Sequence, residues 1–173
     1  MQTTAEATQD KAQYGKTDQR PGKYLTFELG REEFGIQVLK VREIMGIQDI
    51  TAVPHTPPYV KGVINLRGKV IPVVDLRLKF GLQEVEYTQR TCIIVVQVAG
   101  EVGTLLMGIV VDGVSEVLNV TLADIEDTPD FGNGVSTPYI LGMAKMKGKV
   151  KILLEINQVM TSQELQGLDQ VLQ

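Results

Sequence analysis

The strongest constraint on the fold is an apolar stretch, punctuated by glycine, that occurs twice in the chain. Its first copy runs from Gly62 to Asp75, and the same pattern of two glycines and an acidic residue returns 80 positions later at Gly142, Gly148 and Glu155. A recurrence of this kind indicates a duplicated structural unit. The fold assignment therefore has to account for two related units.

A second pair of matching blocks lies upstream of each stretch. Residues 34–44 and 107–117 share a Gly-Ile pair and an acidic residue, Glu43 in the first block and Glu116 in the second, at an offset of 73. Both pairs of blocks occur in the same order with nearly the same spacing. We interpret the chain as an internal duplication that builds two similar β-rich units.

The first copy of the stretch is predicted to form a β-hairpin. Two apolar runs flank Arg67-Gly68-Lys69, and glycine readily supplies the positive φ of a tight turn. The two-residue period of a strand places Asn65 and Arg67 on one face. With Glu43 on a neighbouring short helix, they predict an Arg–Glu pair beside an apolar groove. Such a pair suits recognition, because surface ion pairs contribute little stability.

The composition limits the classes of function. The chain has 173 residues, of which 43% are hydrophobic, and a net charge of −4, which disfavours general binding to nucleic acid or to an anionic membrane. No apolar run approaches the roughly 20 residues of a membrane span. Residues 1–22 lack an apolar signal core, and the single Cys92 cannot form an internal disulfide. We therefore expect a cytoplasmic protein without direct membrane insertion.

The rest of the chain is predicted to form strands joined by short helices. Apolar alternation and apolar runs predict strands near residues 23–29, 34–38, 50–53, 92–98 and 105–111. Apolar spacing suits short helices near residues 38–45, 76–80 and 112–117. The capping-box sequence Thr161-Ser-Gln-Glu164 predicts an amphipathic C-terminal helix over residues 162–173.

The predicted domain organisation follows from the repeat. Residues 1–22 are polar and aperiodic and are expected to form a disordered tail. The folded domain is expected over residues 23–161, with a first unit at about 23–82 and a second at about 91–161. An exchange of strands between the two units is left open. The fold class is all-β.

Candidate catalytic residues do not form a convincing set. The only histidine, His55, lies among prolines and lacks the partners of a metal site or a nucleophile–base pair. The acidic loop at 124–137 lacks the glycine and glutamate spacing of a calcium loop. Asp75 and Asp112 each end an apolar strand, but neither begins the Asp-Thr/Ser-Gly sequence of an aspartic protease. Both are expected to cap the following turn instead.

Three segments resemble the signature of the CheW family, the coupling proteins of bacterial chemotaxis. They are residues 61–77, 34–44 and 108–118, and they stand in the family's order at compatible spacing. The resemblance covers about residues 23–161. One departure is the stretch at 99–106, which looks longer than the usual hairpin of the second unit.

The resemblance implies two five-stranded SH3-like β-barrels packed side by side, without catalysis, cofactor or metal. It implies an adaptor, recruited to membrane-associated receptor arrays, that couples the cytoplasmic tip of chemoreceptors to the regulatory domain of the histidine kinase CheA. The kinase-binding residues are left unassigned. The positions that match the receptor-binding groove of the family are Val41, Glu43, Gly62, Asn65, Arg67 and Gly68.

Two alternatives stay open at this point. The first is a CheW-like adaptor of a receptor–kinase pathway other than chemotaxis. The second, from a different class, is an aspartate-dependent hydrolase that uses Asp75 and Asp112.

Overall fold

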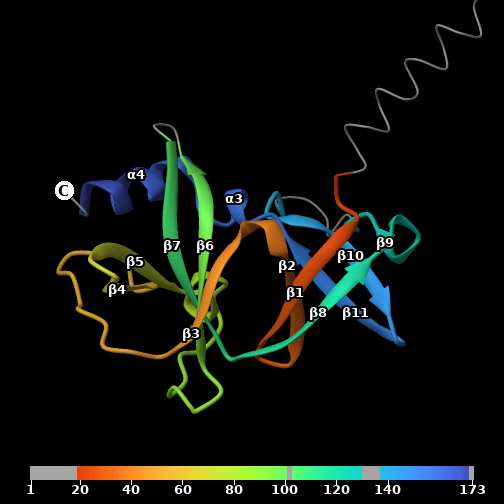
Figure 1. The fold of residues 1–173 in the computed structure, drawn as a ribbon, viewed down its shortest axis with the longest axis horizontal. Helices are drawn as coiled ribbons and strands as arrows, with labels where there is room; N and C mark the ends of the chain where they lie inside the picture. The colour runs from red at the N-terminus through yellow and green to blue at the C-terminus, as the bar shows by residue number, and fades with distance from the viewer. Residues whose placement is uncertain (1–18, 101–102, 130–136, 172–173) are drawn as a thin grey trace, which may run out of the picture.

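Two β-sheets make up the body of the protein, and they pack against each other at one end (Figure 1). The computed structural model describes residues 19–100, 103–129 and 137–171. The six-stranded sheet has the order β8-β1-β2-β11-β10-β9, and the five-stranded sheet has the order β3-β6-β7-β5-β4. The strands are β1 (Gly22–Leu29), β2 (Glu32–Gln37), β3 (Val41–Gly46), β4 (Val60–Leu66), β5 (Lys69–Asp75), β6 (Cys92–Gly100), β7 (Gly103–Val111), β8 (Gly113–Val120), β9 (Ile125–Glu126), β10 (Ile140–Met146) and β11 (Lys149–Leu154).

Short helical segments connect the strands and close the chain. Two single 3-10 turns and three α-helices are described: η1 (Val38–Lys40), η2 (Leu122–Asp124), α2 (Leu76–Lys79), α3 (Ile156–Val159) and α4 (Ser162–Val171). The prediction of an all-β fold with short connecting helices and a C-terminal helix is confirmed. Residues 1–18 of the predicted tail, 130–136 of the acidic loop and 172–173 of the last helix lie outside the described residues.

Each sheet takes strands from both halves of the chain. β1 and β2 lie in the six-stranded sheet with β8 to β11, and β6 and β7 lie in the five-stranded sheet with β3 to β5. The two parallel pairings, β2 with β11 and β5 with β7, join strands from different halves. The pairing thus exchanges strands between the two units predicted from the sequence repeat. The edge strands β3 and β4 do not pair with each other, and neither do β8 and β9, so the sheets are open rather than closed five-stranded barrels.

The duplicated hairpins have the same backbone geometry. The β4–β5 turn has positive φ at Arg67 (49°) and Gly68 (85°), and the β10–β11 turn has positive φ at Lys147 (55°) and Gly148 (75°). Positive φ at both central residues is the geometry that matches the twist of two hairpin strands. The register shifts at one position in each hairpin, between Val60 and Gly62 and, 80 residues later, between Ile140 and Gly142.

Two elements predicted as helices are strands. Residues 41–46 form β3, which pairs with β6, and residues 113–120 form β8, which pairs with β1. In β3 the half-buried residues alternate with exposed ones, a period of two that the sequence spacing at 38, 41, 44 and 45 obscured. The predicted strand at 50–53 is reduced to a single bridge between Thr51 and Val63.

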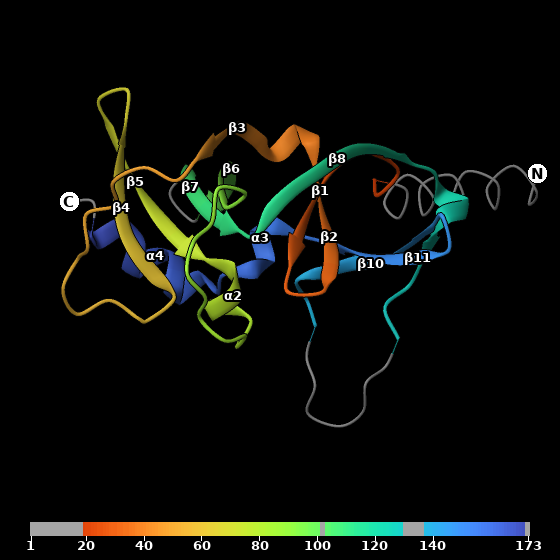
Figure 2. The same ribbon diagram turned by 90° about the horizontal axis from the view of Figure 1, so that it is seen from below.

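One large apolar cluster holds the two sheets and α4 together. It contains Phe27 and Phe34 of the six-stranded sheet, Ile94 and Met107 of the five-stranded sheet, and Leu165 from α4, together with other buried residues. The C-terminal helix is therefore docked on the body of the protein. Figure 2 shows the elongated arrangement that results, with the β4–β5 hairpin near one end and β10 and β11 toward the other.

The residues just before β1 are anchored to the six-stranded sheet. Arg20 Nη1 donates to Asp127 Oδ1 at 2.8 Å and to the Leu141 carbonyl at 3.2 Å. The Tyr24 hydroxyl donates to the Arg20 carbonyl at 2.7 Å. Arg20, which was assigned to the tail predicted over residues 1–22, therefore contacts the folded body.

Candidate partner-docking surface

An exposed ion pair joins the tip of the β4–β5 hairpin to the edge strand β3. Arg67 Nη2 donates to Glu43 Oε2 at 2.6 Å and Nη1 donates to Oε1 at 3.2 Å, so the pair is bidentate. The Arg67 side chain is 75% exposed. Its hydrogen bonds to Glu43 raise the pKa of Arg67 above its usual value. The Arg–Glu pair expected from the sequence is present, although Glu43 lies on a strand and not on a helix.

Asn65 and Gly68 belong to the turn that presents Arg67. Asn65 Oδ1 accepts a hydrogen bond from the Gly68 backbone N–H at 2.8 Å. The Asn65 side chain thus bridges the tip of its own hairpin. Gly68 has φ of 85° and open space around it, so what favours glycine at this position is the backbone angle and not crowding.

The close approach of the Thr51 backbone requires glycine at position 62. A Cβ built on Gly62 would lie 2.0 Å from the Thr51 carbonyl oxygen, and the residue has φ of 143°. Both observations require glycine where the chain near Thr51 bridges to Val63. Gly62 is buried, whereas Val41 is half-buried and packs against the main apolar cluster. The assignment of Gly62 and Val41 to receptor binding stays a prediction.

Two exposed apolar residues flank the Arg67–Glu43 pair in sequence and belong to the same sheet. Ile44 follows Glu43 on β3 and is 45% exposed, and Val70 follows the hairpin turn on β5 and is 50% exposed. Neither residue was predicted as part of the surface, and Ile44 was assigned to the apolar stripe of a short helix. The sequence carries no clear signal for it, because Val41-Arg-Glu-Ile-Met45 does not alternate between apolar and polar residues.

The duplication places a similar arrangement on the other sheet. Lys147, at the position that matches Arg67, lies 3.7 Å from Glu116, which matches Glu43. Val117 and Val150, which match Ile44 and Val70, are also exposed. The second pair is longer and uses a lysine, so it lacks the planar bidentate geometry of the first.

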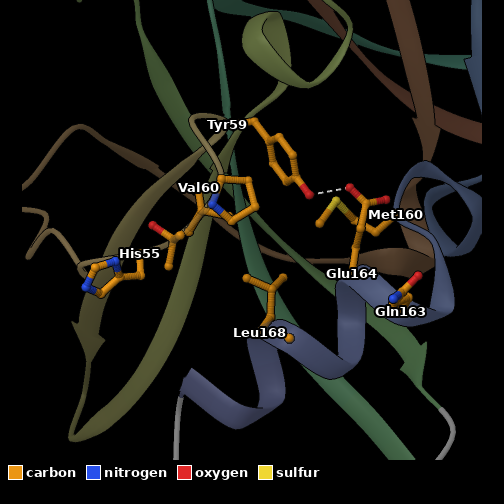
Figure 3. Close-up of a pocket in the computed structure, with 10 residues that line it drawn as sticks. His55, Tyr59, Val60, Met160, Gln163, Glu164 and Leu168 are labelled. Atoms are coloured by element: carbon orange, nitrogen blue, oxygen red, sulfur yellow. Dashed lines mark hydrogen bonds between the residues drawn. The ribbon is translucent and has the colours of Figure 1, made fainter.

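A cavity lies between α4 and the turn that leads into β4 (Figure 3). Its volume is about 480 Å³, and it is lined by apolar residues that include Val60, Met160 and Leu168. Figure 3 shows the Tyr59 hydroxyl pointing at the Glu164 carboxylate across the cavity wall. The Tyr59 hydroxyl donates a short hydrogen bond to Glu164 Oε2, so this wall also attaches α4 to the body.

Glu164 attaches α4 to the body of the protein through several hydrogen bonds. Lys79 Nζ donates to its Oε2 at 2.5 Å, and the Thr161 N–H donates to its Oε1 at 2.8 Å. Thr161 Oγ1 accepts in return from the Glu164 N–H at 3.1 Å, which completes the capping box predicted from the sequence. Partial burial alone raises the pKa of Glu164, but the hydrogen bonds from Lys79, Tyr59 and Thr161 outweigh this effect and lower the pKa to about 2.

The two aspartates considered for catalysis have structural partners. Asp75 Oδ1 caps α2 by accepting from the backbone N–H of Arg77 at 2.9 Å, as expected, and its Oδ2 accepts from the Tyr87 hydroxyl at 3.0 Å. Burial, together with the neighbouring Asp75 carboxylate, raises the pKa of Tyr87. Asp112 does not cap the turn that follows it. It accepts from the Gly30 N–H at 2.7 Å and from Arg77 at 2.6 Å.

Neither a candidate metal cluster nor a membrane-spanning helix is found among the described residues. Within residues 19–100, 103–129 and 137–171 no group of histidine, cysteine and acidic residues could hold a metal ion. His55 is an exposed loop residue, as expected from its sequence context. In the same ranges no helix is long and apolar enough to cross a membrane. The exposed Arg67–Glu43 pair remains the candidate site for contact with another protein.

Comparisons with known proteins give the family. The family described as CheW-like domain matches residues 23–164. Chemotaxis protein CheW of Klebsiella aerogenes is 41% identical over 148 residues, which are 86% of this chain and 87% of that protein. Chemotaxis protein CheW of Rhizobium meliloti is 39% identical over 140 residues, which are 81% of this chain and 88% of that protein.

A solved structure is similar as well. The crystal structure of the scaffolding protein TtCheW from Thermoanaerobacter tengcongensis superposes with a TM-score of 0.73 at 32% identity, and the match covers 83% of this chain and 97% of that one. The chain belongs to the CheW-like domain family. It is a non-enzymatic adaptor of chemotaxis signalling. Neither of the alternative functions considered from the sequence finds support among these relatives.

Proposed function

We propose that this adaptor couples the cytoplasmic tips of chemoreceptors to the histidine kinase CheA, and that the receptor helix docks on the surface formed by Arg67, Glu43, Ile44 and Val70. The observation that carries the proposal is the bidentate Arg67–Glu43 pair, held at an exposed hairpin tip with 2.6 and 3.2 Å contacts. The kinase binds elsewhere on the chain, and the adaptor is recruited to receptor arrays from the cytoplasm.

The chemistry of this surface suits a helix with both apolar and polar side chains. Ile44, which follows Glu43 on β3, and Val70, on β5 just after the hairpin turn, are exposed apolar side chains, and an amphipathic helix binds through apolar anchors with polar contacts at their rim. Arg67 retains donor capacity beyond the two hydrogen bonds to Glu43, because a guanidinium has five N–H groups. It can therefore hold Glu43 and a polar group of the receptor together.

Asn65, Gly68 and Gly62 shape the hairpin that presents Arg67, and Val41 packs against the main apolar cluster. Asn65 and Gly68 fix the turn through their hydrogen bond. Gly62 permits the approach of Thr51 that sets the hairpin against its neighbour. Their contribution to receptor binding is thus expected to be indirect, through the position of Arg67.

The experiment that tests the proposal is a pair of titrations with Arg67→Ala. Hydrogen bonds that involve charged groups are typically worth about 1.5–3 kcal/mol, so affinity for a receptor-tip fragment should fall roughly ten-fold or more. Affinity for the kinase regulatory domain should stay unchanged. Arg67→Lys should restore receptor binding only in part, because lysine lacks the planar fork.

The matched control is Lys147→Ala. It removes the equivalent cation of the second hairpin, which pairs with Glu116, and should leave receptor affinity at the wild-type value. If Arg67→Ala leaves receptor affinity intact and weakens kinase binding instead, the surface has been assigned to the wrong partner.

A further inference from the structure

The chain passes from one sheet to the other at Asp112, between the end of β7 and the start of β8. At this crossover the Asp112 backbone N–H donates to the Glu28 carbonyl of β1 at 3.0 Å. The Asp112 carboxylate accepts from the Gly30 N–H, in the β1–β2 turn, at 2.7 Å. Asp112 is therefore fixed to the six-stranded sheet by two hydrogen bonds.

Arg77 reaches this point from the five-stranded sheet. It lies on α2, directly after β5, and its Nη1 donates to Asp112 Oδ2 at 2.6 Å. Its Nε donates to the Gln83 carbonyl at 3.0 Å, in the connector that leads to β6. The Arg77 side chain is only 15% exposed. The Arg77 guanidinium thus connects α2 to the loop at Gln83 and to the crossover residue Asp112, at the junction of the sheets.

The apolar contacts across the same junction allow sliding more readily than this polar contact does. A row of stacked rings runs across it, with Phe34 and Phe80 centroids 5.9 Å apart and Phe80 and Tyr139 centroids 5.3 Å apart. Stacked rings keep favourable contact over a range of offsets. A charged hydrogen bond, in contrast, weakens quickly when its angle or distance changes. Two other polar contacts join the sheets, Arg90 with Glu28 at 3.0 Å and the Ala99 N–H with Asn157 Oδ1 at 2.9 Å. The Arg77 side chain is much less exposed than that of Arg90.

We propose that Arg77 is a positioning residue that fixes the angle between the two sheets, and that the transfer of a signal through the adaptor depends on this angle. The signalling part of the inference rests on the proposed function. An adaptor that holds a receptor and a kinase passes a change from one to the other only when its binding surfaces keep a fixed relation. The apolar cluster shared by the two sheets limits their relative motion, and the Arg77 contacts add a directional restraint on the angle.

Three variants of the full-length chain separate this role from general stability. Arg77→Gln removes the charge and the fork. Arg77→Lys keeps the charge but cannot bond both Asp112 and Gln83 in the same geometry. The matched control is Arg90→Gln, which removes the contact of Arg90 with Glu28 at 3.0 Å, where the Arg90 side chain is mostly exposed.

The first measurement reads the angle between the sheets and needs no partner. Spin labels at Lys69 on the β4–β5 hairpin and Lys149 on the β10–β11 hairpin, in a Cys92→Ser background, report one distance distribution across both sheets. The wild type and Arg90→Gln should give the same narrow distribution. Arg77→Gln and Arg77→Lys should give a clearly broader one. If Arg77→Gln does not fold, Arg77→Lys decides alone.

The second measurement compares binding with output. The affinities of Arg77→Lys for the receptor fragment and for the kinase regulatory domain, each measured alone, should stay at the wild-type values. Receptor-dependent activation of the kinase should fall about five-fold or more, which is the low end of typical coupling between sites. A loss of stability alone would lower both affinities and the output together.

The outcomes distinguish the two proposals. Narrow distributions in all variants overturn the positioning role of Arg77, whatever the binding data show. A broad distribution with normal kinase activation overturns the link between the angle and signalling. Failure of the wild-type chain to bind a receptor fragment overturns the proposed function and leaves the distance measurement as a valid test of the positioning role.

Discussion

Replacement of Glu164 by glutamine should loosen the C-terminal helix from the body. The carboxylate accepts hydrogen bonds from Tyr59, from Lys79 at 2.5 Å and from the Thr161 N–H at 2.8 Å, and its side chain is 20% exposed. Glutamine offers one neutral oxygen in place of two charged ones. Lys79, which is also mostly buried, would then lack its counterion.

The expected loss in the free energy of unfolding follows from the hydrogen bonds that glutamine cannot form. Hydrogen bonds to charged groups contribute about 1.5–3 kcal/mol each, and a buried partner left unsatisfied adds its desolvation penalty. Because glutamine keeps one acceptor, we expect a total loss of about 2–4 kcal/mol in the free energy of unfolding. For a chain of this size the corresponding decrease in Tm is roughly 4–16 °C.

The pH dependence of stability provides a second signature. The pKa of Glu164 is lowered in the folded protein to about 2 from a usual value of 4.5. A carboxylate with a lowered pKa contributes stability that is fully present above the unfolded pKa and is lost as the pH falls toward the folded pKa. Wild type should therefore lose this contribution between about pH 4.5 and pH 2, and Glu164→Gln should lack that part of the pH dependence.

Urea unfolding at neutral pH and at pH 3, with Glu126→Gln as the control, measures both effects. Glu126 pairs with Lys145 at a site where both side chains are exposed, and such pairs are worth about 0–1 kcal/mol. If Glu164→Gln unfolds at the same urea concentration as Glu126→Gln, α4 does not depend on this carboxylate and the reasoning is wrong.

Three further changes test the backbone argument and the contribution of the N-terminal residues to stability. Gly62→Ala should sharply destabilise or prevent folding, because its Cβ would lie 2.0 Å from the Thr51 carbonyl oxygen; a wild-type circular-dichroism melt would contradict this. Gly68→Val should lower Tm more than Arg67→Ala, since valine at φ of 85° is strained whereas Arg67 is exposed; equal melts would disprove the turn assignment. Deletion of residues 1–18 should leave Tm unchanged, and deletion through Arg20, which accepts the Tyr24 hydrogen bond, should lower it; equal Tm values would show that this anchor is unimportant.

Features that depend on local pattern were predictable from the sequence. The turn at Arg67-Gly68 and its repeat at Lys147-Gly148 follow from glycine between two apolar runs, and positive φ is found at all four residues. The capping box at Thr161 follows from a local spacing too. In these cases the interaction that stabilises the element involves residues close together in the chain, so the sequence contains its signal.

Features that depend on distant partners were not predictable. β3 was expected to be helical because its apolar spacing is ambiguous, and its pairing with β6, about 50 residues away, decides the conformation. The repeat indicated two units but not which strands they exchange, since two similar units can pair with their own strands or with each other's. The contact of Tyr59 with Glu164 and that of Arg77 with Asp112 also join separate regions and have no local signature.

The candidate surface was predictable in part for the same reasons. The pairing of Arg67 with Glu43 was predicted from the place of Arg67 on the hairpin and of Glu43 on a neighbouring element, and the structure places them in direct contact. Ile44 and Val70 were missed because exposure of an apolar side chain depends on which strand covers it. Gly62 was assigned to the groove from the resemblance alone, and its burial against Thr51 could not be predicted, since this approach is a tertiary contact.

The most direct test of the central claim is simultaneous binding of both partners to one adaptor molecule. Full-length protein would be titrated with the kinase regulatory domain in the absence and in the presence of a saturating receptor-tip fragment, and the mixture would be examined by analytical ultracentrifugation. We predict a ternary complex in which the receptor fragment does not reduce the affinity for the kinase domain. With Arg67→Ala, the complex should lose the receptor fragment and keep the kinase domain. Mutually exclusive binding of receptor and kinase would contradict the account, because a protein with one shared surface cannot couple them.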